Sequence, residues 1–191
     1  SRTSHGYSNT LEDRNYVYVY GLDLQKTFSP ADTGQTLAGK VQFRLYNATD
    51  EKYVMAEKSQ KAGLYYVRQK TKNEAEATLF TPAADGRLWI CGLEGDSYEL
   101  TEVATADGYQ LLKEPVTIAI RATDREVIAA AVDTEGKTPL YVGEIHSASA
   151  TVDNQTAQMI CDNAKVTTDV SSENAMVQLE VINTRGFLLP Q

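Results

Sequence analysis

The sequence has few of the residues on which metal centres and catalytic sites are usually built. Its 191 residues include only two cysteines and two histidines. Neither cysteine stands in a CxxC or Cys/His spacing, so no metal is expected. The chain also lacks a Gly-x-Ser-x-Gly elbow and a phosphate-binding loop. We therefore predict no cofactor and no conventional enzyme activity.

Positive charge and long apolar runs are also scarce. The chain has 18 basic and 26 acidic residues, for a net charge of −8. A negative protein is a poor partner for nucleic acid or for an anionic membrane surface, so neither is expected to bind. No apolar run reaches the roughly 20 residues of a membrane-spanning helix. The expected partners are proteins or glycans, or none.

The two cysteines, Cys91 and Cys161, permit a single pairing. In the segment LWICGL, Cys91 has the surroundings of a small buried hydrophobic residue. In an oxidising compartment it would equally well form a disulfide with Cys161. The sequence leaves both alternatives open.

Strand-forming segments are what the sequence has in abundance. Segments rich in β-branched and aromatic residues are bounded by Gly, Pro, Asp or Asn, which predicts an all-β sandwich. Two further segments, 49–63 and 153–166, are candidates for short helices. Gly/Asp clusters between the strands predict turns in preference to calcium loops. The predicted strands span 15–24, 40–47, 63–69, 86–93, 97–104, 116–122, 125–132, 139–145 and 175–183.

Three polar residues interrupt rows of apolar residues. Side chains alternate between the two faces of a strand, so Lys26 continues the row of Tyr20, Leu22 and Leu24. By the same alternation, Glu102 and Asn183 each fall on a face that is otherwise apolar. Singly, each fits a strand end that emerges into solvent. Together, an amine, a carboxyl group and a carboxamide are the three components of an isopeptide-forming reaction.

The segments YGLDLQKTF, GKVQFRLYN, GRLWICGLEGDSYELTEVATADGYQL and VINTRGFLLPQ resemble the Cna B-type, prealbumin-like (Ig-like) domain of Gram-positive surface proteins. The closest resemblance is to the C-terminal domain of a sortase-assembled pilus backbone subunit, a major pilin of fimbriae. It covers roughly residues 15–48, 86–120 and 176–191, and we expect an inserted segment in roughly 121–175. Its most specific part is a glutamate box formed by Tyr98, Leu100, Glu102, Gly108 and Tyr109. The family's proline before the Gly-Tyr pair is absent, because Ala106 and Asp107 stand there.

The resemblance implies a role for each of the three polar residues. Lys26 on the first strand would attack the side chain of Asn183 on the last, and the two strands would be neighbours. Glu102 would polarise the carbonyl of Asn183 and act as the proton shuttle. Burial suits this chemistry because desolvation lowers the pKa of a lysine and frees its amine. The reaction would occur once, within the chain.

The two ends of the chain carry weaker signals. Leu189, Pro190 and Gln191 match the first three positions of the Leu-Pro-any-Thr-Gly sorting signal (LPxTG), as if the chain were trimmed within it. Residues 1–14 resemble a linker or remnant of an upstream pilin domain, which leaves 15–191 as the sandwich. The resemblance therefore implies an extracellular protein of the cell wall or pilus, with sortase and neighbouring pilin subunits as partners.

A binding module is the alternative function. In that hypothesis the chain is an adhesin, and the 121–175 segment and a tyrosine-rich surface recognise a host protein or glycan, since tyrosine is favoured at interfaces. The same tyrosines are also typical of core positions and cross-strand pairs. They are Tyr46, Tyr53, Tyr65 and Tyr66.

Overall fold

The computed structural model of the chain describes residues 19–31, 37–132, 139–161 and 174–186, with the backbone alone described at 19, 122–132, 139–148, 160, 161 and 174. Apart from two short 3₁₀ turns, the regular elements in these ranges are all strands. None of the helices among the described residues is long or apolar enough to span a bilayer. The elements are β1 (Val19–Ser29), η1 (Leu37–Lys40), β2 (Gln42–Asn47), β3 (Lys52–Lys58), β4 (Leu64–Thr71), η2 (Glu74–Glu76), β5 (Arg87–Leu93), β6 (Ser97–Ala104), β7 (Val116–Val132), β8 (Pro139–Val152), β9 (Gln155–Ala157), β10 (Met159–Cys161) and β11 (Asn174–Thr184).

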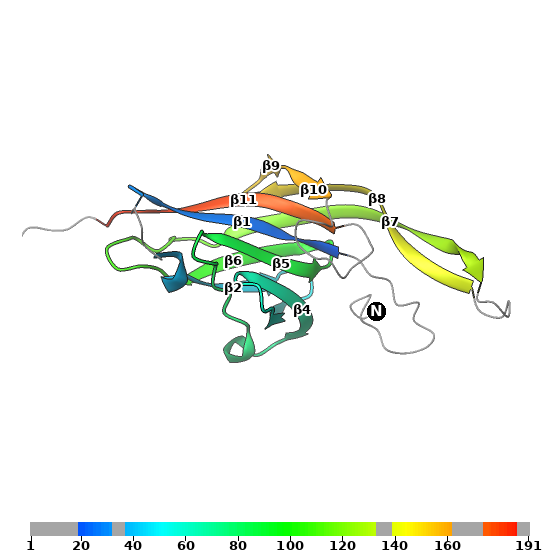
Figure 1. Cartoon of the computed structure of the whole chain (residues 1–191), viewed down its shortest axis with the longest axis horizontal. Coiled ribbons are helices and arrows are strands. Elements are labelled where there is room, and N and C mark those ends of the chain that lie inside the picture. The colour runs from blue at the N-terminus through cyan, green and yellow to red at the C-terminus, as the bar shows by residue number, and fades with distance from the viewer. Residues whose placement is uncertain (1–18, 32–36, 133–138, 162–173, 187–191) are drawn as a thin grey trace, which may run out of the picture.

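The strands form one continuous hydrogen-bonded sheet that curls back on itself. Their order is β10-β11-β1-β5-β4-β3-β2-β6-β7-β8-β9. The two ends of this order, β10 and β9, are separated in the chain by Gln158 alone, whose carbonyl accepts a hydrogen bond from the Gln178 amide at 2.9 Å. Both ends of the sheet therefore meet, and its inner faces enclose one core (Figure 1).

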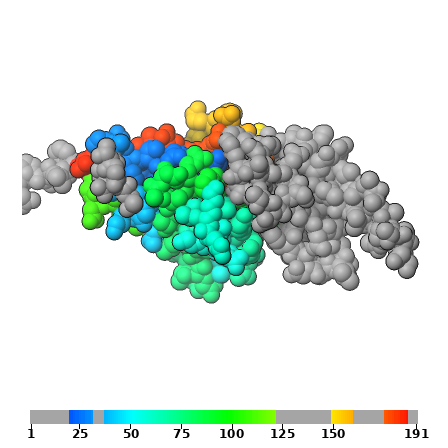
Figure 2. Space-filling model, in the orientation of Figure 1, coloured from blue at the N-terminus to red at the C-terminus, as the bar shows by residue number. Residues whose placement is uncertain are grey.

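The first and last strands lie side by side and run in the same direction. Strand β1 pairs with β11 in parallel over its full length, with Lys26 opposite Val181 and Phe28 opposite Asn183. Both strands extend along the same side of the molecule, above β2 to β5 (Figures 1 and 2). Because residues two apart share a face of a strand, Lys26 and Asn183 point to the same side of this pair.

The alternating pattern of the sequence is visible in the burial of the strands. In β2 and β6 every second residue is buried, which places Phe43, Leu45 and Leu100 in the core with no exposed surface. The prediction of an all-β sandwich is therefore confirmed. The largest fully buried side chains are Tyr20, Tyr98, Phe43, Phe80, Leu22, Leu24, Leu45, Leu88, Ile90, Leu93, Leu100 and Ile118.

The prediction of two short helices is wrong for the residues that the structure describes, and 162–166 lie outside them. Residues 52–58 form β3, because this segment lies between β2 and β4 and its backbone groups pair with both neighbours. In the second candidate, Asp153 and Asn154 have φ values of 49° and 66° and form a two-residue hairpin turn that pairs Val152 with Gln155. Strands β9 and β10 follow this turn instead of a capped helix.

The segment in which we expected inserted material begins as a long two-stranded ribbon. Strand β6 pairs with β7 only over Val116–Ala119, whereas β7 pairs with β8 as far as Val132 and Pro139. Beyond the closed part of the sheet the two strands project together (Figure 1).

Candidate functional site

The three polar residues that interrupt apolar rows are all buried at one end of the core. Lys26 on β1, Glu102 on β6 and Asn183 on β11 retain only 3%, 5% and 1% of their surface exposed. Strand β1 supplies the lysine and its parallel neighbour β11 the asparagine, while β6 approaches from the opposite part of the sheet. The structure thus brings together the residues that the sequence analysis singled out.

The side-chain amide of Asn183 is fully hydrogen-bonded. Its Nδ2 donates to Oε1 of Glu102 at 2.7 Å and to the backbone carbonyl of Gln110 at 2.8 Å. Its Oδ1 accepts from the hydroxyl of Thr105 at 2.8 Å. Both protons and the carbonyl oxygen are engaged, so the amide is held in one orientation.

The two oxygens of Glu102 have different surroundings. Oε1 accepts from Asn183 and from the backbone N–H of Leu112, at 3.0 Å. Oε2 is buried and has no hydrogen-bond partner among the residues that the structure describes. A proton carried on Oε2 would therefore displace no existing hydrogen bond.

In the described part of the chain, the ammonium group of Lys26 contacts two backbone carbonyls and an aromatic ring, and no carboxylate lies within ion-pair distance. Nζ donates to the carbonyls of Thr27 at 2.7 Å and Val181 at 3.3 Å, and lies 4.1 Å from the centre of the Phe28 ring. Burial lowers the pKa of Lys26 from 10.5 to about 8, and the charge of Glu102 opposes this shift only in part. The amine is therefore far more available near neutral pH than that of an exposed lysine.

The loop that follows β6 covers the site. Its Tyr109 ring packs edge-on against Phe28 with the ring centres 4.8 Å apart, and its hydroxyl donates to the Pro30 carbonyl at 3.0 Å. The Gln110 amide donates to the Thr184 carbonyl at 2.9 Å, and the Gly186 amide to the Gly108 carbonyl at 2.6 Å. The loop is thus tied to the ends of β1 and β11 and keeps the core residues beneath it away from solvent.

The contacts differ in one respect from the sequence prediction. Glu102 was expected to polarise the carbonyl of Asn183, but its carboxyl group contacts the amide nitrogen, and Thr105 contacts the oxygen. The sequence analysis missed Thr105 because a threonine at the start of a polar turn carries no distinctive signal. The backbone groups of Gln110 and Leu112 carry none at all.

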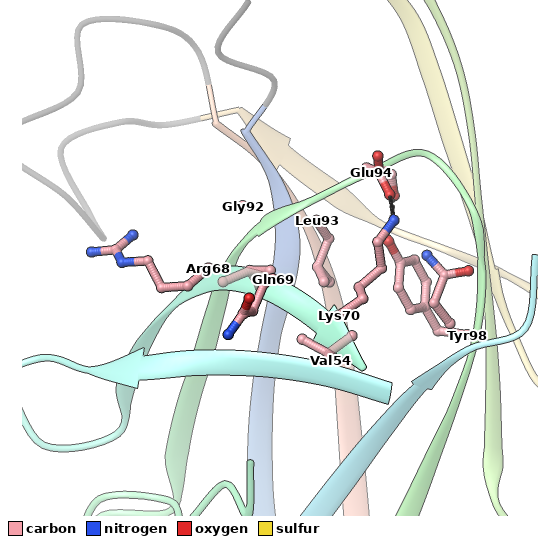
Figure 3. A pocket seen from close by; sticks show the side chains of 10 residues that line it. Val54, Arg68, Gln69, Lys70, Gly92, Leu93, Glu94 and Tyr98 are labelled. Atoms are coloured by element: carbon pink, nitrogen blue, oxygen red, sulfur yellow. Dashed lines mark hydrogen bonds and ion pairs between the residues drawn. The ribbon is translucent and has the colours of Figure 1, made fainter. Parts of the chain in front are cut away.

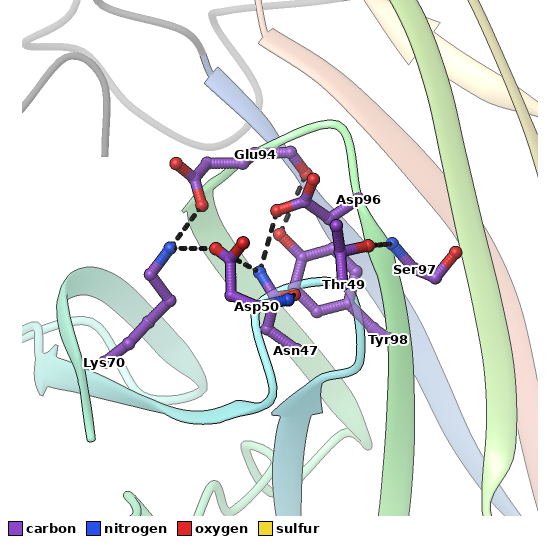
Figure 4. Close-up of polar contacts among 8 residues, drawn as sticks. All are labelled: Asn47, Thr49, Asp50, Lys70, Glu94, Asp96, Ser97 and Tyr98. Atoms are coloured by element: carbon purple, nitrogen blue, oxygen red, sulfur yellow. Dashed lines mark hydrogen bonds and ion pairs between the residues drawn. The ribbon is translucent and has the colours of Figure 1, made fainter. Parts of the chain in front are cut away.

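A second polar cluster lies at the turns joining β2 to β3 and β5 to β6. Lys70 forms ion pairs with Asp50 and with Glu94, the latter at 2.6 Å, while Asn47 donates to Asp96 at 2.8 Å (Figure 4). Oxygens of the three carboxylates lie within 4.8 Å of one another, so they are the group most able to hold a metal among the residues described. The Lys70 ammonium already neutralises two of them.

Lys70 also crosses a shallow pocket between β4 and the end of β5 (Figure 3). Val54, Val67 and Leu93 give it apolar walls. Its full lining is Asn47, Val54, Val67, Arg68, Gln69, Lys70, Gly92, Leu93, Glu94 and Tyr98.

The two cysteines considered as a disulfide pair are the next candidate residues. Cys91 is a buried free thiol, and burial raises its pKa to about 12. The side chain of Cys161 lies outside the described residues. Cys91 packs with Leu64 and Met176 on the outer side of the sheet, next to Asp23, which is buried and paired with Arg87. Asp23 falls on the face of β1 that the alternation does not assign to the core.

The tyrosines proposed as a binding surface serve mainly to pack strands. Tyr65 is buried against Phe80, with ring centres 4.8 Å apart. Tyr46 and Tyr53 form a cross-strand pair between β2 and β3, also at 4.8 Å. Residues 1–14 and the sorting-signal residues Leu189, Pro190 and Gln191 lie outside the described residues.

Comparison with known proteins gives one family and several similar structures. The family model of the SpaA prealbumin-like fold domain matches residues 24–137, which includes the first part of the segment expected to be inserted. The pilus 2b backbone protein of group B streptococcus is 22% identical over 87% of this chain and 41% of that chain, with a TM-score of 0.45. The minor pilin GBS52 of Streptococcus agalactiae is 15% identical over 92% of this chain and 48% of that chain, with a TM-score of 0.44.

The C-terminal domain of the shaft pilin SpaA of Lactobacillus rhamnosus GG is 17% identical, over 84% of this chain and 97% of that one, with a TM-score of 0.40. The chain spans less than half the length of the two streptococcal structures. No curated protein matches it.

Proposed function

Because the chain belongs to the family of SpaA prealbumin-like fold domains, we propose that it is a structural domain of a Gram-positive pilus. In this proposal it is the C-terminal domain of a wall-anchored backbone subunit, stabilised by an isopeptide bond that it forms between Lys26 and Asn183. The supporting observation is the buried cluster of an amine on the first strand, a carboxamide on the last strand and a carboxyl group on β6.

The proposed reaction is a single amide exchange. The neutral amine of Lys26 attacks Cγ of Asn183, and a new C–N bond forms as the carbonyl becomes an oxyanion. Glu102 accepts the surplus proton from Nζ and delivers it to Nδ2, with which it is already hydrogen-bonded. The Cγ–Nδ2 bond then breaks, ammonia leaves, and the carbonyl is restored. Each chain reacts once, so the domain is not an enzyme in the usual sense.

The environment of Lys26 supports this chemistry. With a pKa of about 8 in place of 10.5, the neutral fraction of the amine at pH 7 rises about 300-fold. The fixed contacts of the Asn183 amide hold the second reactant in place. Such positioning of reacting groups can lower a barrier by roughly 7–11 kcal/mol.

The bond would give the domain mechanical resistance. It closes a loop of 183 − 26 = 157 residues, which on a chain-entropy model restricts the unfolded state by about 5 kcal/mol. Force that enters through β1 and leaves through β11 would pass directly across the cross-link. The strands between these two would then carry little of the load, as a pilus shaft requires.

Intact-mass spectrometry tests the cross-link. We expect the folded chain to be lighter than its formula by about 17 Da, the mass of one ammonia, whereas a disulfide would remove only about 2 Da and be reversed by reduction. Lys26→Met and Glu102→Gln should each restore the full mass. Lys70→Met is the matched control, because Lys70 is also surrounded by carboxylates and an asparagine yet should not react. A folded wild-type chain of full mass would contradict the proposal.

Attachment to the wall and to neighbouring subunits forms a separate part of the proposal. It rests on family membership and on the sequence Leu189-Pro190-Gln191. A chain extended by Thr and Gly after Gln191 should be joined by sortase to an amine acceptor, and the same chain carrying Pro190→Ala should not. Equal reaction of both chains would exclude this sequence as the sorting signal.

A further inference from the structure

We propose that Thr105 is a further catalytic residue of the cross-linking reaction, whose hydroxyl stabilises the negative charge that develops on Oδ1 of Asn183. This inference rests on the proposed function, since it concerns the same bond-forming step. It adds a residue outside the lysine, glutamate and asparagine that the resemblance implies.

The geometry places a donor on the atom that becomes negative. Oγ1 of Thr105 donates to Oδ1 of Asn183 at 2.8 Å, and this oxygen takes up the negative charge when the amine adds to Cγ. Asn183 is almost completely buried, and hydrogen bonds to a developing charge are strongest where water is excluded.

The orientation of the amide is fixed independently of Glu102. Nδ2 of Asn183 also donates to the backbone carbonyl of Gln110 at 2.8 Å. A backbone carbonyl can only accept, so exchanging the oxygen and nitrogen of the amide would set two acceptors against each other. The carbonyl oxygen therefore faces Thr105, and the leaving nitrogen faces Glu102 and Gln110.

This arrangement separates two tasks in the reaction. Glu102 contacts the nitrogen and moves the proton, while Thr105 keeps its own proton and donates a hydrogen bond throughout. As Lys26 attacks, the C=O π electrons move onto Oδ1, and the Thr105 hydroxyl is already directed at that atom. When the Cγ–Nδ2 bond breaks, the carbonyl reforms with the same hydrogen bond, so Thr105 ends the reaction unchanged.

The rate of ammonia loss tests this role. The chain is made by pulsed cell-free synthesis, and the cross-linked fraction is followed over time by intact mass. Loss of one oxyanion donor typically slows a reaction by about a hundredfold or more, so Thr105→Val and Thr105→Ala should react about a hundred times more slowly than wild type. Thr105→Ser, which restores the hydroxyl, should recover most of the rate. Thr184→Val is the control, because Thr184 is an exposed neighbour of Asn183 on β11.

Two further measurements separate catalysis from damage to the fold. Thermal unfolding in a Lys26→Met background, where no cross-link forms, should show that the alanine or valine variant still folds. The pH at which the rate is half-maximal should stay near that of wild type, whereas a site opened to water would shift it upward as Lys26 regains solvation.

The outcomes are distinct. Wild type that never loses ammonia overturns the proposed function together with this inference. Wild type that reacts at the same rate as Thr105→Val and Thr105→Ala, or slow variants that Thr105→Ser does not rescue, overturn the role of Thr105 alone.

Discussion

Two parts of the molecule each bring together a lysine, at least one carboxyl group and a buried asparagine. They differ in the charged groups that surround the lysine. Among the residues that the structure describes, the carboxyl group that acts on Lys26 is that of Glu102, and the direct contacts are backbone carbonyls and an aromatic ring. Around Lys70 there are two carboxylates in direct contact, those of Asp50 and Glu94. The residue types are nearly the same, but the electrostatic environments are opposite.

The two lysines consequently differ in pKa. Desolvation lowers the pKa of Lys26 to about 8. Desolvation also acts on Lys70, but hydrogen bonds and charges from Asp50 and Glu94 outweigh it and the pKa is raised. Lys70 thus remains an ammonium group that holds two turns together, whereas Lys26 can become a nucleophile.

The asparagines differ as well. Oδ1 of Asn47 accepts a backbone N–H, that of Asp50 at 2.8 Å, and Nδ2 donates to Asp96. These contacts fix a turn between β2 and β3. Oδ1 of Asn183 accepts instead from a hydroxyl group, and Nδ2 contacts a carboxyl group whose second oxygen has no hydrogen-bond partner in the part of the chain that the structure describes. If Lys26 reacts as proposed, the charges around the lysine decide which cluster is reactive, because the residue types of the two clusters are nearly the same.

Force spectroscopy should show the largest difference between variants of the two clusters, in how far the chain extends under load. When the chain is pulled from its ends, wild type should not extend between Lys26 and Asn183. Lys26→Met should unfold and release 157 residues, which at about 3.5 Å per residue is about 550 Å of contour length. Lys70→Met should resist extension as wild type does. Equal extension of wild type and Lys26→Met would show that no cross-link carries the load.

The pH dependence of the reaction should reveal which lysine reacts. Because the pKa of Lys26 is about 8, the rate of ammonia loss should fall about tenfold for each pH unit below 8 and level off above it. Time courses of intact mass, recorded from about pH 5.5 to about pH 9.5, measure this profile. A rate that still rises tenfold per unit at the alkaline end would instead indicate a lysine with an ordinary or raised pKa, such as Lys70.

The smallest effect is expected from the ion pairs of Lys70. Lys70→Met removes hydrogen bonds to the partly buried Glu94 and to the exposed Asp50. It should lower the free energy of unfolding, measured by urea denaturation, by about 1.5–3 kcal/mol, mostly through Glu94 because solvent screens the Asp50 pair. The raised pKa of Lys70 gives stability that is present below pH 10.5 and is lost as the pH rises through the folded-state value. The difference between wild type and variant should therefore shrink at strongly alkaline pH. If the difference in the free energy of unfolding does not change with pH, Lys70→Met acts through lost packing contacts and not through lost ion pairs.

Much of the fold followed from the alternation of apolar residues. It identified the strands that bury Leu22, Leu45 and Leu100, and it marked the three polar residues of the site because they broke the pattern. It missed β3, where lysine and glutamate between the apolar residues resemble a helix surface. The pairing of this segment with two neighbouring strands overrides that local preference.

Other features had no local signal. Asp23 is buried on the outer side of β1 because Arg87, 64 residues away in sequence, pairs with it. Thr105 and the carbonyl of Gln110 reach Asn183 only because the loop after β6 folds back over β11. Such contacts depend on the arrangement of the whole sheet, which a single sequence does not reveal.

The parallel pairing of β1 with β11 also determines how such a domain would fit in a series. A chain that enters at Val19 and leaves at Thr184 traverses the pair from one pole to the other, in contrast to a hairpin, which returns to its starting point. Eleven residues of strand correspond to an axial rise of about 36 Å. Domains joined end to end in this way would lengthen a fibre by a constant step, and the proposed bond between Lys26 and Asn183 would bridge the two strands that carry the chain into and out of each domain.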